Sequence, residues 1–407
     1  MTTDRSPVSL GAPRLALFAT STMTGFGIGS WVTRTPAVRT DLGASIETMG
    51  IVLLGLSIGS MLGILGAGAL IRRVGTRPLI LLGGALPVIG MLLVGLLAPA
   101  ALTPGVAAGL FLVGFGSGMA EIGLNVEAAA LERVLERPVI PTLHACFSLG
   151  SVLGGGVGIL ASAARVPVGV HLPIAAAVMA ALAITAALFL RPLPREQEPE
   201  PTRTVAGTRT RSVLTLQVAL IAVIVLAMAF AEGSASDWLP LLMTTSHDAP
   251  EVVGSLVFTG FSLAMLVGRS AGSPLVARFG RATVIRGCGI VGLVGVLGVA
   301  LAPSAALTVV AAAVWGLGIA LGFPVAVSAA GDHPTDGDRR VSIVATAGYF
   351  AFLVGPPSLG FLGEHLGLQT AMFVPAALLL VALLVAKATA PRSVASAGSV
   401  AAPGPAA

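Results

Sequence analysis

Charged residues are scarce in this chain: Asp, Glu, Lys and Arg make up 10% of its 407 residues. A soluble globular domain carries about 25%. Hydrophobic residues account for 55% of the chain, which is too much apolar surface to hide in one water-soluble core. The composition therefore excludes an ordinary soluble domain and predicts a protein that has lipid as its solvent.

Cysteines and the motifs of common enzymes are also nearly absent. The two cysteines, Cys146 and Cys288, lie in apolar segments in opposite halves of the chain, so a disulfide or a thiolate metal site is not expected. The sequence has no phosphate-binding Gly-x-x-x-x-Gly-Lys loop, no His/Cys ligand spacing and no nucleophile elbow. We therefore expect no enzyme activity, no cofactor, no metal and no primary pump.

Long apolar stretches dominate the rest of the chain, and each has about the 20 residues that a helix needs to cross a bilayer. The predicted spans cover residues 14–35, 46–71, 78–98, 104–131, 141–163, 168–190, 213–238, 251–276, 283–302, 304–330, 341–363 and 369–389. The predicted organisation is a cytoplasmic tail (1–13), a six-helix bundle (14–190), a polar cytoplasmic linker (191–212), a second six-helix bundle (213–389) and a disordered cytoplasmic tail (390–407). The sequence thus predicts an all-α polytopic membrane protein.

The basic residues indicate the orientation. Of the 23 Lys and Arg residues, only Arg34, Arg39 and Arg165 fall on one side of the spans, and only Arg269 lies well inside a span. The others cluster in the tails and loops of the opposite side, as cytoplasmic segments do. We therefore expect a multi-pass protein of the cytoplasmic membrane with both termini in the cytoplasm. Because these residues lie in short loops between spans, we expect no nucleic-acid partner.

The two halves of the chain repeat each other. The loop after the second span shares a pattern with the loop after the eighth span. At one constant spacing, Leu70, Arg73 and Gly75 correspond to Leu275, Arg278 and Gly280. Two parallel repeats of six helices, related by an axis along the membrane normal, are an architecture of alternating-access transporters.

The loop motif and several motifs inside the spans carry a family resemblance. The loop is matched by Gly68, Leu70, Arg73, Gly75 and Arg77, although Arg72 stands where an acidic residue is usual. The chain resembles the major facilitator superfamily over its full helical length. A narrower resemblance to fucose-permease-like bacterial transporters rests on Glu121 with Asn125, Arg137-Pro138, His144 to Gly150, Ala231-Glu232-Gly233 with Asp237-Trp238, Gly268-Arg269, and Gly348-Tyr349 with Gly355-Pro356-Pro357. The resemblance implies that the first, fourth, seventh and tenth spans line a central cavity.

Acidic residues inside the membrane are the main candidates for function, because ionisable side chains are costly there. Glu121 and Asn125 are four residues apart and share one face of the fourth span, which suits a proton or substrate site. Glu232 precedes Gly233 in the seventh span, where the helix either bends at a binding site or packs closely against a neighbour. Asp237 lies near the outer end of the same span, and Tyr349 lies in the middle of the eleventh span as a further cavity candidate.

Four residues are candidates for gates. Glu127 and His144 are expected at similar depth on neighbouring spans, where they form either an inner gate or an ordinary interfacial pair. Asp237 and Arg34 are expected near the outer ends of the seventh and first spans, where they form either an outer gate or a solvated ion pair.

Arg269 needs a partner because a lone buried guanidinium is unstable. It either binds an anionic substrate or pairs with Glu121 or Glu127 across the bundles, and we favour the structural pair.

These features predict a secondary active transporter, resembling a symporter of the inner membrane. We expect it to move a small polar organic solute, such as a sugar or sugar acid, by alternating access with protons as the coupling ion, and to be a monomer in the lipid bilayer. Proton-coupled efflux of hydrophobic or cationic compounds is the alternative. A non-transporting membrane sensor with the same fold is a second alternative.

Overall fold

The structure is a computed structural model that describes residues 11–135, 139–190, 213–332 and 336–390. Its helices are α1 (Gly11–Val32), α2 (Thr35–Leu42), α3 (Ile46–Val74), α4 (Thr76–Leu97), α5 (Thr103–Leu135), α6 (Ile140–Ala163), α7 (Val168–Phe189), α8 (Leu216–Ser246), α9 (Glu251–Ser270), α10 (Gly272–Phe279), α11 (Arg281–Leu301), α12 (Ala305–Ile319), α13 (Gly322–Gly331), α14 (Gly337–Leu366), α15 (Leu368–Ala371), α16 (Phe373–Val385) and a 3₁₀ turn at Ala386–Thr389. Twelve segments within the described ranges are long and apolar enough to cross a membrane.

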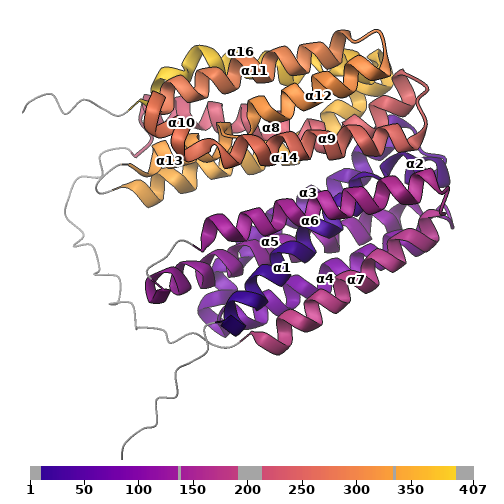
Figure 1. The fold of residues 1–407 in the computed structure, drawn as a ribbon, viewed down its shortest axis with the longest axis horizontal. Helices are drawn as coiled ribbons and strands as arrows, with labels where there is room; N and C mark the ends of the chain where they lie inside the picture. Colours follow the sequence, from indigo (N-terminus) through magenta and orange to yellow (C-terminus); the bar gives the residue numbers. More distant parts are fainter. Residues whose placement is uncertain (1–10, 136–138, 191–212, 333–335, 391–407) are drawn as a thin grey trace, which may run out of the picture.

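The helices form two bundles, α1–α7 and α8–α16, that lie side by side (Figure 1). We use the term linker face for the end at which α7 finishes and α8 begins, and far face for the end that carries α2. The described part of the chain consists of helices joined by turns and short loops and contains no strand. The predicted fold class, twelve spans in two six-helix bundles, is confirmed. The predicted tails and the linker 191–212 lie wholly or mostly outside the described residues.

Several features of the helices differ from the predicted spans. The first predicted span ends early, at Val32, and a separate short helix α2 follows on the far face. The eighth span ends at Ser270, and its predicted continuation is the separate helix α10. The tenth span is interrupted at Ala320 and Leu321, between α12 and α13. Apolar residues continue through the break at Ala320 and Leu321, so hydropathy alone could not locate it. Polar residues mark the other two breaks: Thr33 to Thr35 follow α1, and Arg269 and Ser270 end α9.

The repeated loop motif ends two equivalent helices in the same way. Gly75 ends α3 with φ 83° and ψ −179°, and Gly280 ends α10 with φ 75° and ψ 158°. This backbone region is essentially restricted to glycine, because a Cβ atom would clash there. The motif glycines therefore set the reversal between consecutive helices on the linker face.

Glycines also allow neighbouring helices to touch within a bundle. A Cβ atom on Gly59 of α3 would lie 2.2 Å from the carbonyl oxygen of Phe111 in α5, and one on Gly114 would lie 2.0 Å from that of Leu56. Helices α1 and α6 meet in the same way. Such close backbone approach is how small residues hold membrane helices together where no hydrophobic force acts between them.

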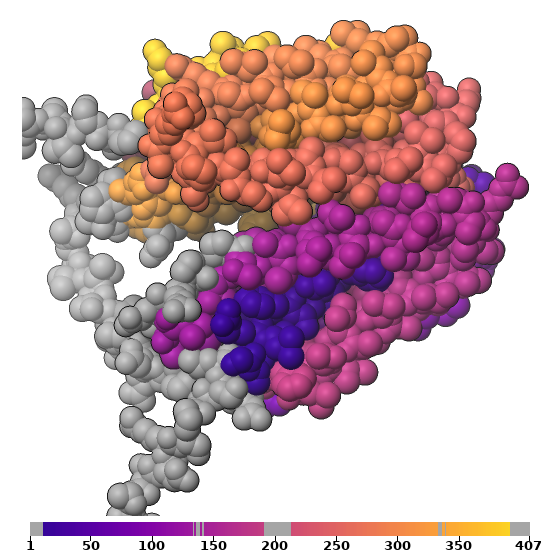
Figure 2. Space-filling model, viewed as in Figure 1, coloured from indigo at the N-terminus to yellow at the C-terminus, as the bar shows by residue number. Residues whose placement is uncertain are grey.

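The two bundles touch at the far face and separate toward the linker face (Figure 2). Contact between them is made mainly by α3 with α14 and by α6 with α9. We call these two lines of contact the α3/α14 seam and the α6/α9 seam, and the space that opens toward the linker face the hollow. The molecule is therefore closed at one end and open at the other.

Candidate functional site

Glu121 of α5 and Tyr349 of α14 face each other across the hollow. Glu121 is exposed and forms no hydrogen bond or ion pair with the described residues. Tyr349 is half-buried on the opposite bundle and lies close enough for the charge of Glu121 to act on its phenol. Asn125 is half-buried one helical turn from Glu121 and makes no hydrogen bond to it in the described structure. An uncompensated carboxylate in a membrane cavity can bind a proton or a substrate cation.

Glu232 and Arg269 form the ion pair of the hollow. Nη2 of Arg269 in α9 donates a hydrogen bond of 3.0 Å to Oε1 of Glu232 in α8, and their side chains are 35% and 27% exposed. The predicted pairing of Arg269 with Glu121 or Glu127 is wrong. The two partners belong to one bundle. They meet because α8 and α9 are adjacent helices that place the two side chains at the same depth in the bundle.

His144 of α6 is the neighbour of that pair in the other bundle. Its side chain is exposed, and the charge of Arg269 acts on its imidazole. The expected pair of Glu127 and His144 is absent among the described contacts. Instead, Oε1 of Glu127 accepts a hydrogen bond from the hydroxyl of Thr76, the first residue of α4. Glu127 therefore links α5 to α4 within one bundle, while His144 is available to the hollow.

Arg34 lies at the α6/α9 seam, at the far face. Its guanidinium is 3% exposed, donates to Oγ of Ser162 at 3.0 Å and to the carbonyl oxygen of Val166 at 2.7 Å, and lies 4.0 Å from a carboxylate oxygen of Glu251. Burial lowers the pKa of Arg34, and the charges of Glu251 and Asp41 oppose this shift. The expected pair of Arg34 and Asp237 is thus wrong.

Asp237 is half-buried on α8 and has no partner among the described residues. Arg34 also lines a cavity of about 540 Å³ at the seam, which Asp41, Arg165 and Glu251 share.

Hydroxyl groups complete the α6/α9 seam. Oγ of Ser255 in α9 donates to the carbonyl oxygen of Thr33 at 3.0 Å and lies 3.3 Å from Oγ of Ser162. Both serines are buried. Nothing in the local sequence selects them, since serines near span ends are common and only the packing of α6 on α9 brings them together.

Glu364 of α14 is the residue at the α3/α14 seam that the sequence analysis missed. Its Oε2 accepts hydrogen bonds from the backbone N–H groups of Ile46 at 2.7 Å and Glu47 at 3.4 Å, at the start of α3. The predicted eleventh span ended at residue 363, so Glu364 fell just outside it. The serine cap at Ser45 marks the start of α3 in the sequence, but only the structure shows that Glu364 lies opposite this start.

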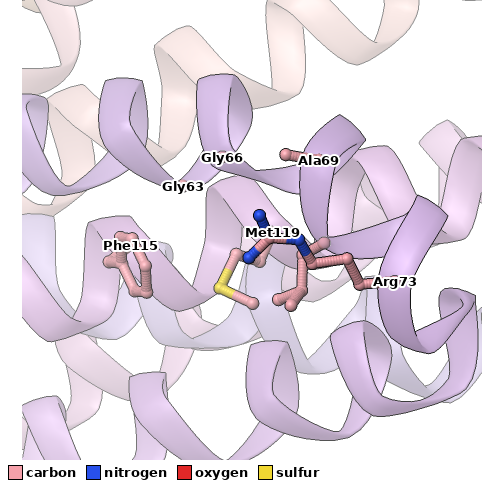
Figure 3. Close-up of a pocket in the computed structure, with 7 residues that line it drawn as sticks. Gly63, Gly66, Ala69, Arg73, Phe115 and Met119 are labelled. Carbon is pink, nitrogen blue, oxygen red and sulfur yellow. The ribbon is translucent and has the colours of Figure 1, made fainter.

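The loop-motif residues lie at the linker face, away from Glu121. Gly63, Phe115, Met119 and Arg73 are among the residues that line a pocket of about 250 Å³ between α3 and α5 (Figure 3). Arg77 and Arg278 are exposed, and the Arg278 guanidinium lies 5.3 Å from the centre of the Phe279 ring. Gly68 has open space around it apart from the Arg72 side chain. These residues shape the linker-face loops rather than the centre of the hollow.

Comparisons with known proteins agree with this architecture. A family model described as Major Facilitator Superfamily matches residues 4–134 and 238–406, so the chain belongs to that superfamily and is a transporter rather than an enzyme. The uncharacterized transporter y4wD of Sinorhizobium fredii (strain NBRC 101917 / NGR234) is 29% identical over 354 residues, covering 86% of this chain and 91% of that protein.

Two solved structures share the fold at low sequence identity. A bacterial homolog of the human lysosomal transporter Spinster, in an inward-facing and unoccupied conformation, has a TM-score of 0.73 and 14% identity, covering 94% of this chain and 98% of its own. A single-residue variant of the fucose:proton symporter FucP of E. coli has a TM-score of 0.63 and 15% identity, covering 94% of this chain and all (100%) of its own.

Proposed function

We propose that the protein is a secondary active transporter that moves a small polar organic solute, sugar-like or sugar-acid-like, across the cytoplasmic membrane with protons. The single observation that carries this proposal is the arrangement of polar groups in the hollow. Glu121 and His144 belong to one bundle, whereas Glu232, Arg269 and Tyr349 belong to the other. A solute that contacts both sets of residues would favour the state in which the bundles close around it at the linker face, which is what alternating access requires.

The proton is proposed to bind Glu121 or Glu232. Glu121 has no described counter-charge, and Glu232 becomes free to take a proton whenever a solute or a movement draws Arg269 away. Asn125 and Tyr349 supply hydrogen-bonding groups for a hydroxylated solute, and Asp237 is a further acidic candidate.

The linker face is proposed to be cytoplasmic, with both termini on that side. Arg72, Arg73, Arg77, Arg278, Arg281, Arg286, Arg339, Arg340 and Lys387 all belong to helix ends or loops at that face. Lys and Arg are enriched in cytoplasmic loops. In this orientation the hollow is open to the cytoplasm and both seams close the outer side. The transporter is proposed to work as a monomer.

Efflux of hydrophobic or cationic compounds is the second candidate. It is favoured by Glu121, whose carboxylate is exposed to the hollow with no basic partner among the described residues. A cationic compound would supply the missing charge, so the two candidates differ in the ligand rather than in the fold.

A ligand screen followed by proton flux tests both candidates. Neutral sugars, sugar acids, amino acids and lipophilic cations are screened by thermal shift; a ligand at 100 times its dissociation constant stabilises the native state by about 2.7 kcal/mol. Each hit is then added to proteoliposomes that contain a pH-sensitive dye. Solute-driven proton movement that is lost in Glu121→Gln and kept in Glu47→Gln supports the proposal. Stabilisation by lipophilic cations alone favours efflux, and proton movement that survives both Glu121→Gln and Glu232→Gln contradicts the proposed coupling.

A further inference from the structure

The start of α3 is capped by two residues from different bundles. The first backbone N–H groups of a helix have no partner within the helix. In α3, the N–H of Thr48 donates to Oγ of Ser45 at 3.0 Å, which is an ordinary cap within one bundle. The N–H groups of Ile46 and Glu47 donate to Glu364, which belongs to the other bundle. The cap is therefore complete only while the far face is closed.

The same seam brings the two backbones close together one turn further along. A Cβ atom on Gly50 would lie 2.9 Å from the carbonyl oxygen of Pro356 and 3.1 Å from Cα of Gly360. A Cβ atom on Gly360 would lie 2.9 Å from Cα of Gly50. The absence of side chains at this crossing is what lets the Glu364 carboxylate reach the first turn of α3.

The chemistry favours a carboxylate in that position. The N-terminus of a helix carries a partial positive charge, and hydrogen bonds to an ionised acceptor are stronger than neutral ones. Glu47 already places one acid in the first turn of α3, but it moves with α3 and cannot join the bundles. Glu364 is exposed at the rim of the seam, so water can take its place on the N–H groups when the bundles part.

The spacing that relates Arg73 to Arg278 also relates Ile46 to Glu251, the first residue of α9. The two equivalent helix starts therefore face opposite bundles at the two seams. At the start of α9 the opposing group is the guanidinium of Arg34, 4.0 Å from the Glu251 side chain. Only the start of α3 has its backbone N–H groups capped by a side chain of the other bundle in the described structure.

We propose that Glu364 is a positioning residue for the transport cycle: by capping α3 from the opposite bundle, it holds the far face closed and sets how often that face opens. This goes beyond the proposed function, because it concerns the equilibrium of the empty protein and holds for any solute or coupling ion. Loss of the contact should raise the population of the far-face-open state on the order of tenfold, which corresponds to about 1.4 kcal/mol.

The test measures opening as an alkylation rate in the full-length protein in nanodiscs. The parent carries Cys146→Ser and Cys288→Ser, and Ser255→Cys as the only thiol, since Ser255 is 0% exposed at the other seam. Its rate of alkylation by a polar maleimide reports the time for which the far face is open. Glu364→Gln is expected to raise the rate about tenfold. Its matched control, Glu47→Gln, removes a carboxylate from the same helix end and is expected to change the rate less than about twofold.

Two further variants separate a gating role from a structural one. Ser45→Ala removes the cap within the bundle and is expected to lower the melting temperature without raising the alkylation rate. Glu364→Asp, a milder change for folding, is expected to give an intermediate rate because the shorter side chain keeps the charge but not the reach. An unchanged rate in Glu364→Gln, or an equal rise in Glu47→Gln, would overturn the proposal. Because the alkylation assay contains no solute, its result does not depend on solute-driven proton movement, so the proposed function can fail while this proposal stands.

Discussion

The two seams that close the far face do the same task with different chemistry. At the α3/α14 seam, Gly50 and Gly360 let two backbones touch, and a carboxylate caps a helix start. At the α6/α9 seam, buried Arg34 and a chain of hydroxyl groups hold the bundles beside a cavity of about 540 Å³. The first seam depends on the absence of side chains, whereas the second depends on one large side chain. Pseudo-symmetry of the fold therefore does not extend to the contacts that hold it closed.

The largest effect is expected where Gly50 of α3 meets Gly360 of α14, because a larger side chain there should prevent the α3/α14 seam from closing. Gly50→Val places methyl groups where a Cβ atom alone would lie 2.9 Å from the carbonyl oxygen of Pro356, so the α3/α14 seam cannot close. We expect the far-face-open state to become dominant, as measured by alkylation of Ser255→Cys. Gly156→Val is the matched control, because a Cβ atom on Gly156 of α6 would meet no other atom within 4 Å. A low alkylation rate in Gly50→Val would show that the crossing is not needed for closure.

A substitution in the hollow should change transport but not the opening of the far face, unlike a substitution at either seam. Glu232→Gln is expected to abolish solute-driven transport without changing far-face alkylation, because its carboxylate pairs with Arg269 inside one bundle. Uptake in proteoliposomes and the alkylation rate, measured on the same sample, check this. Unaltered transport would remove Glu232 from the mechanism.

Arg269→Ala tests whether the ion pair in the hollow serves stability or solute binding. If Arg269 mainly satisfies Glu232, its removal leaves an uncompensated acid and should lower the melting temperature more than the affinity for solute. The pair is about one-third exposed, so the loss should be on the order of 1 kcal/mol. A stable variant that no longer binds solute would instead make Arg269 a direct binding residue.

Arg34→Lys tests the seam that depends on a large side chain. Lysine keeps the charge but cannot donate to Ser162 and Val166 at once in the geometry of the guanidinium. We expect a loss of about 1–2 kcal/mol in stability, seen as a lower melting temperature, and a modest rise in Ser255→Cys alkylation. A wild-type melting temperature would show that water replaces the lost donors without cost.

The smallest expected effect concerns Asp41, which shares the cavity with Arg34. Burial raises the pKa of Asp41, and the charge of Arg34 partly opposes the shift. The folded state therefore holds this proton more tightly than the unfolded state, so stability is lost as pH rises through the folded pKa, from about 4 upward. Asp41→Asn should flatten that part of the melting-temperature profile. Identical profiles would indicate that Asp41 does not couple to the seam.

The sequence predicted the spans well because a bilayer imposes a length and a composition that can be read from one chain. The second span, expected at 46–71, is α3 at Ile46–Val74, and the glycine of the repeated loop motif ends its helix in both copies. It also identified the residues of the hollow. Glu121 and Glu232 were selected because acidic groups inside a membrane are rare, and Tyr349 was selected because it lies in the middle of the eleventh span.

The partners of those residues could not be predicted, because pairing depends on helix rotation and tilt. From the sequence, Glu121 and Glu127 were the candidate partners of Arg269, and only the contact of α8 with α9 selects Glu232. Glu364 was missed for a different reason: it lies one residue beyond a predicted span, and nothing local shows that the start of another helix covers it.

Alternating access is tested most directly by measuring the distance between the two bundles at the far face and at the linker face of the same protein variant. Spin-label pairs at Ala100 and Ala306 on the far face, and at Thr142 and Ser342 on the linker face, occupy exposed positions on opposite bundles. In Gly50→Val, pulsed-EPR distances should lengthen across the far face and shorten across the linker face, because each bundle moves as one body. A far face that opens while the linker-face distance stays unchanged would contradict that account.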